Sequence, residues 1–180
     1  AAAAGNNGIG VAGVNWGASI MPVRVGDENN AALVADLAQG IVFAVDGGAH
    51  VISISLASVN TSSLVNAITY AHLSDVLVFA ARGNAGDTAD VYPSSYTDVI
   101  SVGGLSPCDT RKTYTSCDGD SLTTTSYGGG QNKMDFVAPS VGIMTTDIMG
   151  IGGTGGDYDL FGGTSAACPF AAGVGALIRS

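Results

Sequence analysis

The sequence predicts an α/β protein built on a doubly wound parallel sheet with flanking helices. Short runs rich in β-branched residues alternate with stretches whose apolar residues recur at helical spacing, a pattern typical of parallel strands joined by right-handed crossovers. The 180 residues are 46% hydrophobic and only 12% charged, which favours a chain with a sizeable core. The 27 glycines fit many tight connections, and we find no internal repeat.

The strands are predicted from short, β-branched runs bounded by turn residues: 20–25, 50–55, 76–80 and 98–104. Helices are predicted for 31–45 and 62–72, because each places its apolar residues along one side. The apolar side of the first consists of Leu33, Val34, Leu37, Ile41 and Val45, and that of the second of Leu64, Val65 and Ile68. We interpret the polar stretch 108–130 as a surface loop or hairpin.

A ligand site is expected at one edge of this sheet. Ligands of doubly wound sheets bind at the carboxyl ends of the strands. Residues 55–57 and 82–84 lie at or shortly after the ends of two predicted strands. We therefore expect these two segments to border the same site.

The charge of the chain argues against two classes of partner. Six basic and fifteen acidic residues give a net charge of −9, and the sequence contains no basic stripe. We therefore expect neither nucleic acid nor an anionic membrane as a partner. No apolar run reaches the roughly 18 residues that span a bilayer.

The segment 162–180 carries the clearest chemical signal. A Gly-Thr-Ser turn leads directly into a helix of small residues and places Ser165 in its first turn. Unpaired backbone N–H groups and the positive end of the helix dipole meet there, so a negative charge beside Ser165 is stabilised. Ser165 is therefore a candidate nucleophile. The alternative is an ordinary helix N-cap, for which serine is a preferred residue.

The sequence around Ser165, GTSAACP, resembles the GTSxAxP signature of subtilisin-like serine proteases, and further segments resemble this family in its own order. NNGIGVAGV at 6–14 is similar to the calcium loop of the family, and HVISISLAS at 50–58 is similar to its substrate-binding strand. FAARGNAGD at 79–87 is similar to the oxyanion-hole segment, and VAP at 137–139 stands in the place of the usual APG. The resemblance identifies residues 1–180 as a partial subtilisin-like peptidase domain. It implies a serine endopeptidase that hydrolyses extended polypeptides.

The resemblance supplies two of the four parts of a hydrolytic site. Ser165 matches the nucleophile, and Asn84 matches the side chain that helps to hold the oxyanion. The alternative for Asn84 is a turn residue in the left-handed conformation. His50 and His72 align with no catalytic position, so we expect them to be structural. The base and the acid of a Ser-His-Asp triad are therefore missing.

In the family, both missing residues precede the segment with which this sequence begins. Residues 1–4 resemble the tail of the helix that carries the histidine, and the sequence ends inside the helix that Ser165 begins. We therefore expect a domain truncated at both ends, which lacks the N-terminal Asp/His segment and C-terminal helices. It should need the remainder of the catalytic domain and be inactive as an isolated fragment. A propeptide is a further candidate partner.

Two other functions compete with this interpretation. The first is a catalytically inactive, subtilase-derived binding module that lacks the histidine and the aspartate altogether. The second is a nucleotide-binding α/β protein, but the glycine-rich segment 152–163 lacks the G-x-G-x-x-G context after a first strand.

Substrate binding in the family implies that an extended peptide adds a strand to exposed segments of the chain. Ser55, Leu56 and Ala57 match one such segment, with Ala57 in place of the usual glycine.

The resemblance implies that the opposing wall of the first specificity pocket consists of Ala81, Arg82 and Gly83. It also places Val91 near the base of this pocket. Arg82 departs from the small residue often found there. We expect its side chain to point away from the pocket, whereas an inward guanidinium would favour acidic substrate side chains.

Structural Ca²⁺ is the cofactor that the resemblance implies. Residues 5–11, GNNGIGV, match the strong calcium loop, which makes the carbonyls of Gly5, Ile9 and Val11 and the amide oxygen of Asn7 ligands. Calcium takes six to eight oxygen ligands. The other ligands of the family, including a carboxylate, lie upstream. The alternative is that Asn-Asn-Gly is only a tight turn.

The three cysteines predict one disulfide. Cys108 and Cys117 enclose a short polar loop, and closing such a loop contributes about 2 to 3 kcal/mol in the chain-entropy model. A disulfide indicates an oxidising environment, so we expect a secreted, extracellular protein. Cys168 is expected to be a small buried packing residue. The alternative of a cysteine nucleophile is disfavoured because no local histidine partners Cys168.

Overall fold

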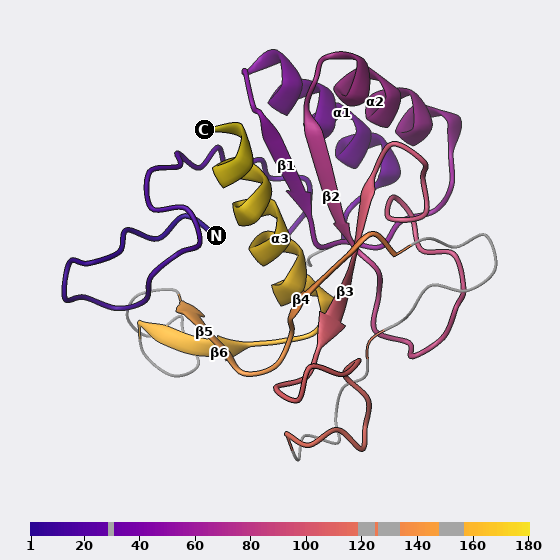
Figure 1. Cartoon of the computed structure of the whole chain (residues 1–180). Coiled ribbons are helices and arrows are strands. Elements are labelled where there is room, and N and C mark those ends of the chain that lie inside the picture. Colours follow the sequence, from indigo (N-terminus) through magenta and orange to yellow (C-terminus); the bar gives the residue numbers. More distant parts are fainter. Residues whose placement is uncertain (29–30, 119–124, 126–133, 148–156) are drawn as a thin grey trace.

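A four-stranded parallel sheet forms the centre of the structure, a computed structural model that describes residues 1–28, 31–118, 125, 134–147 and 157–180 (Figure 1). Its strands follow the order β1-β2-β3-β4, with the bounds Val51–Ile54, Leu77–Ala81, Ile100–Leu105 and Phe136–Pro139. The first three were predicted from the sequence. All neighbours pair in parallel, so the carboxyl ends of the strands meet at one edge.

Helices cover both faces of this sheet (Figure 1). Helices α1 (Val34–Asp46) and α2 (Ser62–Leu73) pack on one face, and α3 (Thr164–Arg179) packs on the other. Helix α2 starts where it does because the hydroxyl of Thr61 accepts a hydrogen bond from the backbone nitrogen of Leu64 at 3.4 Å. The predicted parallel sheet with flanking helices is confirmed.

The core lies on both sides of β2. Val78 and Ala80 pack with α1 and α2, whereas Phe79 and Ala81 point to the opposite face and pack with α3. Small residues let α3 approach the sheet closely, since a Cβ placed on Gly175 would lie 2.6 Å from the ring of Phe79. This close packing holds α3 against the sheet.

One local prediction was wrong. Residues 20–25 form no strand, because this segment lies apart from the free edge of β1 and β-branched residues need a paired neighbour to form a ladder. The segment lines a cleft of about 1480 Å³ together with residues of α1, β1 and α3. Residues 1–4, which resemble the tail of a helix, are not helical in this structure. They run beside Gly13 and Asn15, whose backbone nitrogens donate to Ala3 and Ala1 at 2.9 and 3.1 Å.

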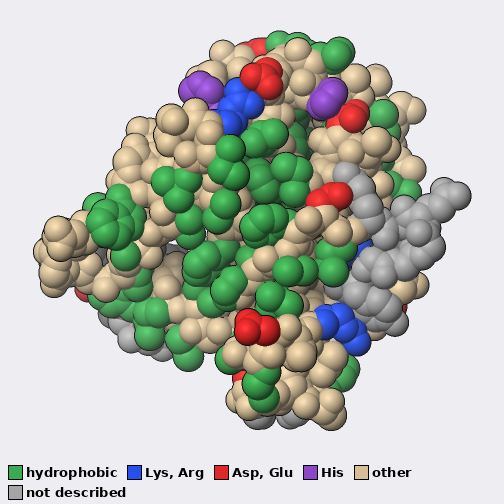
Figure 2. Space-filling model, viewed as in Figure 1, with side chains coloured by type: hydrophobic (Ala, Val, Ile, Leu, Met, Phe, Trp, Pro, Cys, Tyr) green, Lys and Arg blue, Asp and Glu red, His purple; other side chains and the backbone are tan. Residues whose placement is uncertain are grey.

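An antiparallel hairpin of β5 (Ile143–Thr146) and β6 (Tyr158–Phe161) leads into α3. Met144, Leu160 and Phe161 of this hairpin are exposed. Figure 2 shows hydrophobic side chains gathered on the same face, over α3 and its surroundings. Such an area of exposed apolar surface is typical of a face that another part of a protein covers.

Parts of two predicted segments lie outside the described residues, namely most of 119–130 and residues 152–156. Within the described part of the chain, residues 108–118 form an irregular loop, as predicted. None of the helices in that part is long and apolar enough to cross a bilayer.

Candidate active site

The predicted site segments meet at the carboxyl edge of the sheet. Ser55 directly follows β1, Arg82 directly follows β2, and Ser165 is the second residue of α3. A backbone hydrogen bond of 2.8 Å from Ser58 to Tyr92 also ties the chain after β1 to the loop that follows residues 82–84. The structure thus brings together segments that are more than a hundred residues apart in sequence.

Thr164 joins the asparagine to the start of α3. The side-chain oxygen of Asn84 accepts hydrogen bonds from the backbone nitrogen and the hydroxyl of Thr164, at 2.9 and 3.0 Å. The Thr164 hydroxyl in turn accepts a hydrogen bond from the backbone nitrogen of Gly83 at 3.1 Å. Thr164 is fully buried, whereas Asn84 is exposed and Ser165 is half-buried. Asn84 is therefore an exposed residue held next to Ser165 by its bonds to Thr164.

The turn before Ser165 requires glycine. Gly163 has a φ of 75°, and a Cβ on it would lie 2.9 Å from the Asn84 amide nitrogen. Its backbone nitrogen donates to the carbonyl of Ser140 at 2.8 Å. Ser140 in turn donates from its backbone nitrogen and its hydroxyl to the carbonyl of Leu105, at 3.1 and 2.9 Å. The end of β3 thus fixes the turn that presents Ser165.

The sequence reasoning missed Thr164 and Ser140. Thr164 stands inside the GTS signature and so could have been singled out. Ser140 had no comparable signal, because its role arises from bonds to residues far away in the sequence.

Arg82 is fully buried and turned toward the loop that follows it. Its two terminal nitrogens donate to the carbonyls of Ala89 and Thr88 at 2.8 and 3.3 Å. Its Nε makes no hydrogen bond among the described residues. The guanidinium therefore supports the loop that leads to Val91.

Both histidines lie away from the carboxyl edge. His50 directly precedes β1, and His72 lies in the last turn of α2, shortly before β2. Both are exposed at the amino ends of the parallel strands, and Figure 2 shows them at the top of the molecule. Neither histidine is placed to take a proton from Ser165.

Residues 5–11 form an exposed loop in which Asn6, Gly8 and Gly10 have positive φ. The amide oxygen of Asn7 accepts a hydrogen bond from the backbone nitrogen of Ile9 at 3.1 Å, which closes a tight turn. No group of three or more His, Cys, Asp or Glu side chains able to hold a metal occurs among the described residues. Any cation bound here would therefore rely on neutral oxygens from this segment.

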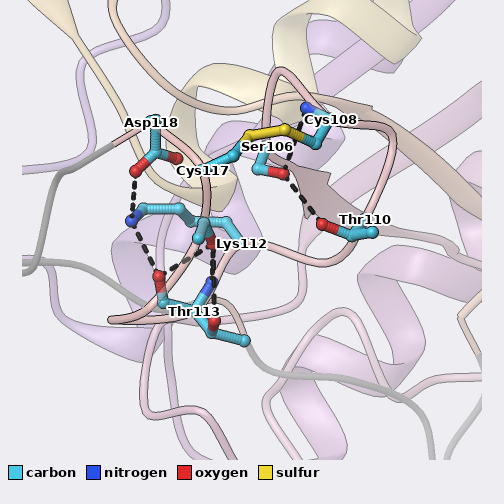
Figure 3. Close-up of a disulfide and its surroundings, with 8 residues drawn as sticks. Ser106, Cys108, Thr110, Lys112, Thr113, Cys117 and Asp118 are labelled. Carbon is cyan, nitrogen blue, oxygen red and sulfur yellow. Dashed lines mark hydrogen bonds and ion pairs between the residues drawn. A yellow bond between two sulfur atoms is a disulfide. The ribbon is translucent and has the colours of Figure 1, made fainter.

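A disulfide joins Cys108 to Cys117 in the loop after β3 (Figure 3). Inside the same loop, the ammonium group of Lys112 lies 3.1 Å from a carboxylate oxygen of Asp118 and donates to the Thr113 carbonyl at 2.8 Å. The side chains of Lys112 and Asp118 are only 0% and 4% exposed. The loop therefore combines a covalent link with a buried ion pair.

Cys168 lies one helical turn after Ser165, on the buried side of α3. Burial raises the pKa of its thiol, and weak contacts with Ser53 and the Ile54 carbonyl oppose this effect. A thiol with a raised pKa is a poor nucleophile at neutral pH.

Comparison with solved structures defines the class of fold. The protease domain of PatA, solved as an S218A mutant, has a TM-score of 0.68 and 27% identity, and the match covers 86% of this chain and 52% of that one. The prenylagaramide maturation protease PagA gives a TM-score of 0.67 and 27% identity, and the match covers 84% of this chain and 51% of that one. The chain thus has the fold of these protease domains.

The sequence comparison is more specific, since the profile of the subtilase family matches residues 1–180. The chain therefore belongs to the subtilase family.

Curated relatives include a thermophilic serine proteinase of Bacillus sp. (strain AK1), which is 36% identical over 181 residues, all of this chain and 40% of the relative. Thermitase of Thermoactinomyces vulgaris is also 36% identical over 181 residues, all of this chain and 58% of the relative. Subtilisin BL of Lederbergia lenta is 34% identical over 178 residues, 98% of this chain and 59% of the relative. The chain thus spans about half the length of these relatives.

Proposed function

We propose that this chain is part of the catalytic domain of a serine endopeptidase in which Ser165 is the nucleophile and Asn84 an oxyanion donor. The observation that carries the proposal is the set of bonds from Thr164 to Asn84, because it holds the asparagine beside Ser165 at the start of α3. The hydroxyl of Ser165 attacks the scissile carbonyl. The negative charge that develops on the carbonyl oxygen of the substrate is stabilised by the Asn84 amide and by the backbone N–H groups at the start of α3.

The substrate is an extended polypeptide that adds a strand to the segments at the carboxyl edge of the sheet. Ser55, Leu56 and Ala57 form one side of this cleft, and Leu56 and Ala57 are exposed as such pairing needs. Ala81, Arg82 and Gly83 form the other side. Since Arg82 is buried and bound to loop carbonyls, it shapes this wall and does not contact the substrate.

The base and the acid of the triad come from the remainder of the catalytic domain. Two observations support this part of the proposal: both histidines lie at the amino ends of the strands, and the exposed apolar face over α3 and the hairpin needs a cover. A propeptide is a further candidate partner. The isolated 180 residues are therefore expected to show no appreciable turnover.

Structural Ca²⁺ at residues 5–11 is part of the proposal, with Gly5, Asn7, Ile9 and Val11 as ligands. The loop fits a hard cation in one respect: among the described residues, no backbone–backbone bond outside helices and strands uses the carbonyls of Gly5, Ile9 or Val11. Bound Ca²⁺ would supply stability, not chemistry at Ser165. The disulfide between Cys108 and Cys117 supports the proposal that the protein is secreted.

A second candidate function is an inactive binding module, with which the position of both histidines is equally compatible. The two functions are separated by assaying the full-length protein on a denatured protein substrate. The endopeptidase proposal expects turnover in the wild type that Ser165→Ala abolishes, with substrate-like inhibitors still bound. A wild type that binds peptide substrates without cleaving them would be the binding module.

A further inference from the structure

Helix α3 lacks one backbone hydrogen bond at its start. Pro169 lies inside the helix, four residues after Ser165. In an α-helix the N–H of residue 169 would donate to the carbonyl of residue 165, but proline has no N–H. The carbonyl of the candidate nucleophile therefore needs a donor from outside the helix.

Ser55 supplies that donor. Its hydroxyl donates a hydrogen bond of 2.9 Å to the carbonyl oxygen of Ser165. Ser55 is half-buried and follows β1 directly, so the bond runs from the sheet to the first turn of α3. The neighbouring contact between Ser53 and Cys168, at 3.5 Å, comes from the same side of the same strand and leads to a different helical residue.

We propose that Ser55 is a positioning residue for Ser165: its hydroxyl replaces the helical donor that Pro169 removes and so fixes the backbone that carries the nucleophile. The proposal rests on the proposed function and adds a role to a segment otherwise assigned to substrate binding through its backbone. The bond also couples substrate binding to the position of the nucleophile, because a substrate strand that pairs with residues 55–57 orders Ser55, which holds Ser165. Ser55 positions Ser165 through its hydroxyl, so only substitutions that remove this hydroxyl should lower kcat.

The test is a double-mutant cycle in the full-length protein. Ser55→Ala should lower kcat about two- to tenfold with little change in KM, the size expected for one neutral hydrogen bond. Pro169→Ala restores an N–H at position 169, so Ser55→Ala in that background should cost clearly less. Ser55→Thr keeps the hydroxyl and should retain most of kcat, whereas Ser53→Ala, the matched control, should leave it unchanged.

Equal kcat losses from Ser55→Ala in the two backgrounds would overturn the inference while leaving the endopeptidase proposal intact. A wild type without turnover would contradict the endopeptidase proposal instead. The same cycle measured by urea unfolding then decides whether Ser55 replaces the missing donor. A smaller loss of stability from Ser55→Ala in the Pro169→Ala background supports the replacement, and additive losses overturn it.

Discussion

The side-chain oxygen of Asn84 accepts both hydrogen bonds that Thr164 offers it, at 2.9 Å from the backbone nitrogen and 3.0 Å from the hydroxyl. A backbone N–H only donates, so the atom that faces it must be the amide oxygen. The amide nitrogen of Asn84 is thereby left for another acceptor. This orientation is the one that an oxyanion donor requires.

Asn84→Ala in the full-length protein should lower kcat about 100- to 1,000-fold with little change in KM, a magnitude that was measured on subtilisin itself, a member of this family. Thr164→Val should lower kcat by less, about tenfold, because it removes the hydroxyl bond to Asn84 but keeps the bond from the backbone nitrogen and leaves the amide present. Steady-state kinetics on a peptide substrate measures both. An Asn84→Ala protein with a raised KM and a normal kcat would contradict the role given to Asn84.

Much of the fold could be predicted from local patterns, but the site could be predicted only in part. The segments that became β1, β2, β3, α1 and α2 were recognised because each carries its own periodicity. The segment 20–25 has the same β-branched character and no neighbour to pair with, so its pattern was misleading. Ser140 acts through bonds to Leu105 and Gly163, which lie far away in the sequence and which no local pattern encodes, whereas Thr164 stands inside the GTS signature.

Removing one member of the buried ion pair between Lys112 and Asp118 should destabilise the protein strongly, whereas replacing both members by apolar residues should not. Lys112→Met or Asp118→Leu alone should lower the free energy of unfolding by about 3 to 5 kcal/mol, because each removes the opposite charge from a buried ion pair. The double variant should recover most of this loss, since two apolar side chains need no pairing. Urea unfolding of the wild type and the three variants measures the coupling, and additive losses would show that the pair does not act as a unit.

Cys168 should resist alkylation in the folded protein. Its raised pKa lowers the fraction of thiolate at pH 8 below that of an exposed cysteine, and burial blocks access. Iodoacetamide should therefore label the peptide containing Cys168 only after unfolding, while Cys108 and Cys117 stay unlabelled until they are reduced. Peptide mapping by mass spectrometry follows each site, and rapid labelling of Cys168 under native conditions would contradict its burial.

Calcium should stabilise the full-length protein through residues 5–11. Binding to the folded state alone adds about 2.7 kcal/mol at a hundredfold excess over Kd, so a chelator should lower Tm. Asn7→Ala removes the only side-chain ligand proposed in this segment and should reduce the shift in Tm, while kcat in excess calcium stays unchanged. Equal shifts in wild type and Asn7→Ala would mean that Asn7 serves only the tight turn with Ile9.

If Ser165 is an activated nucleophile, a fluorophosphonate should label it covalently in the full-length protein. The probe reacts with a serine whose proton is removed by a base and whose oxyanion is stabilised. We expect one phosphonate per chain, located on the peptide containing Ser165, with the label absent from Ser165→Ala and its attachment strongly slowed in Asn84→Ala. A wild-type protein that is folded, binds peptide substrates and leaves Ser165 unlabelled would contradict it.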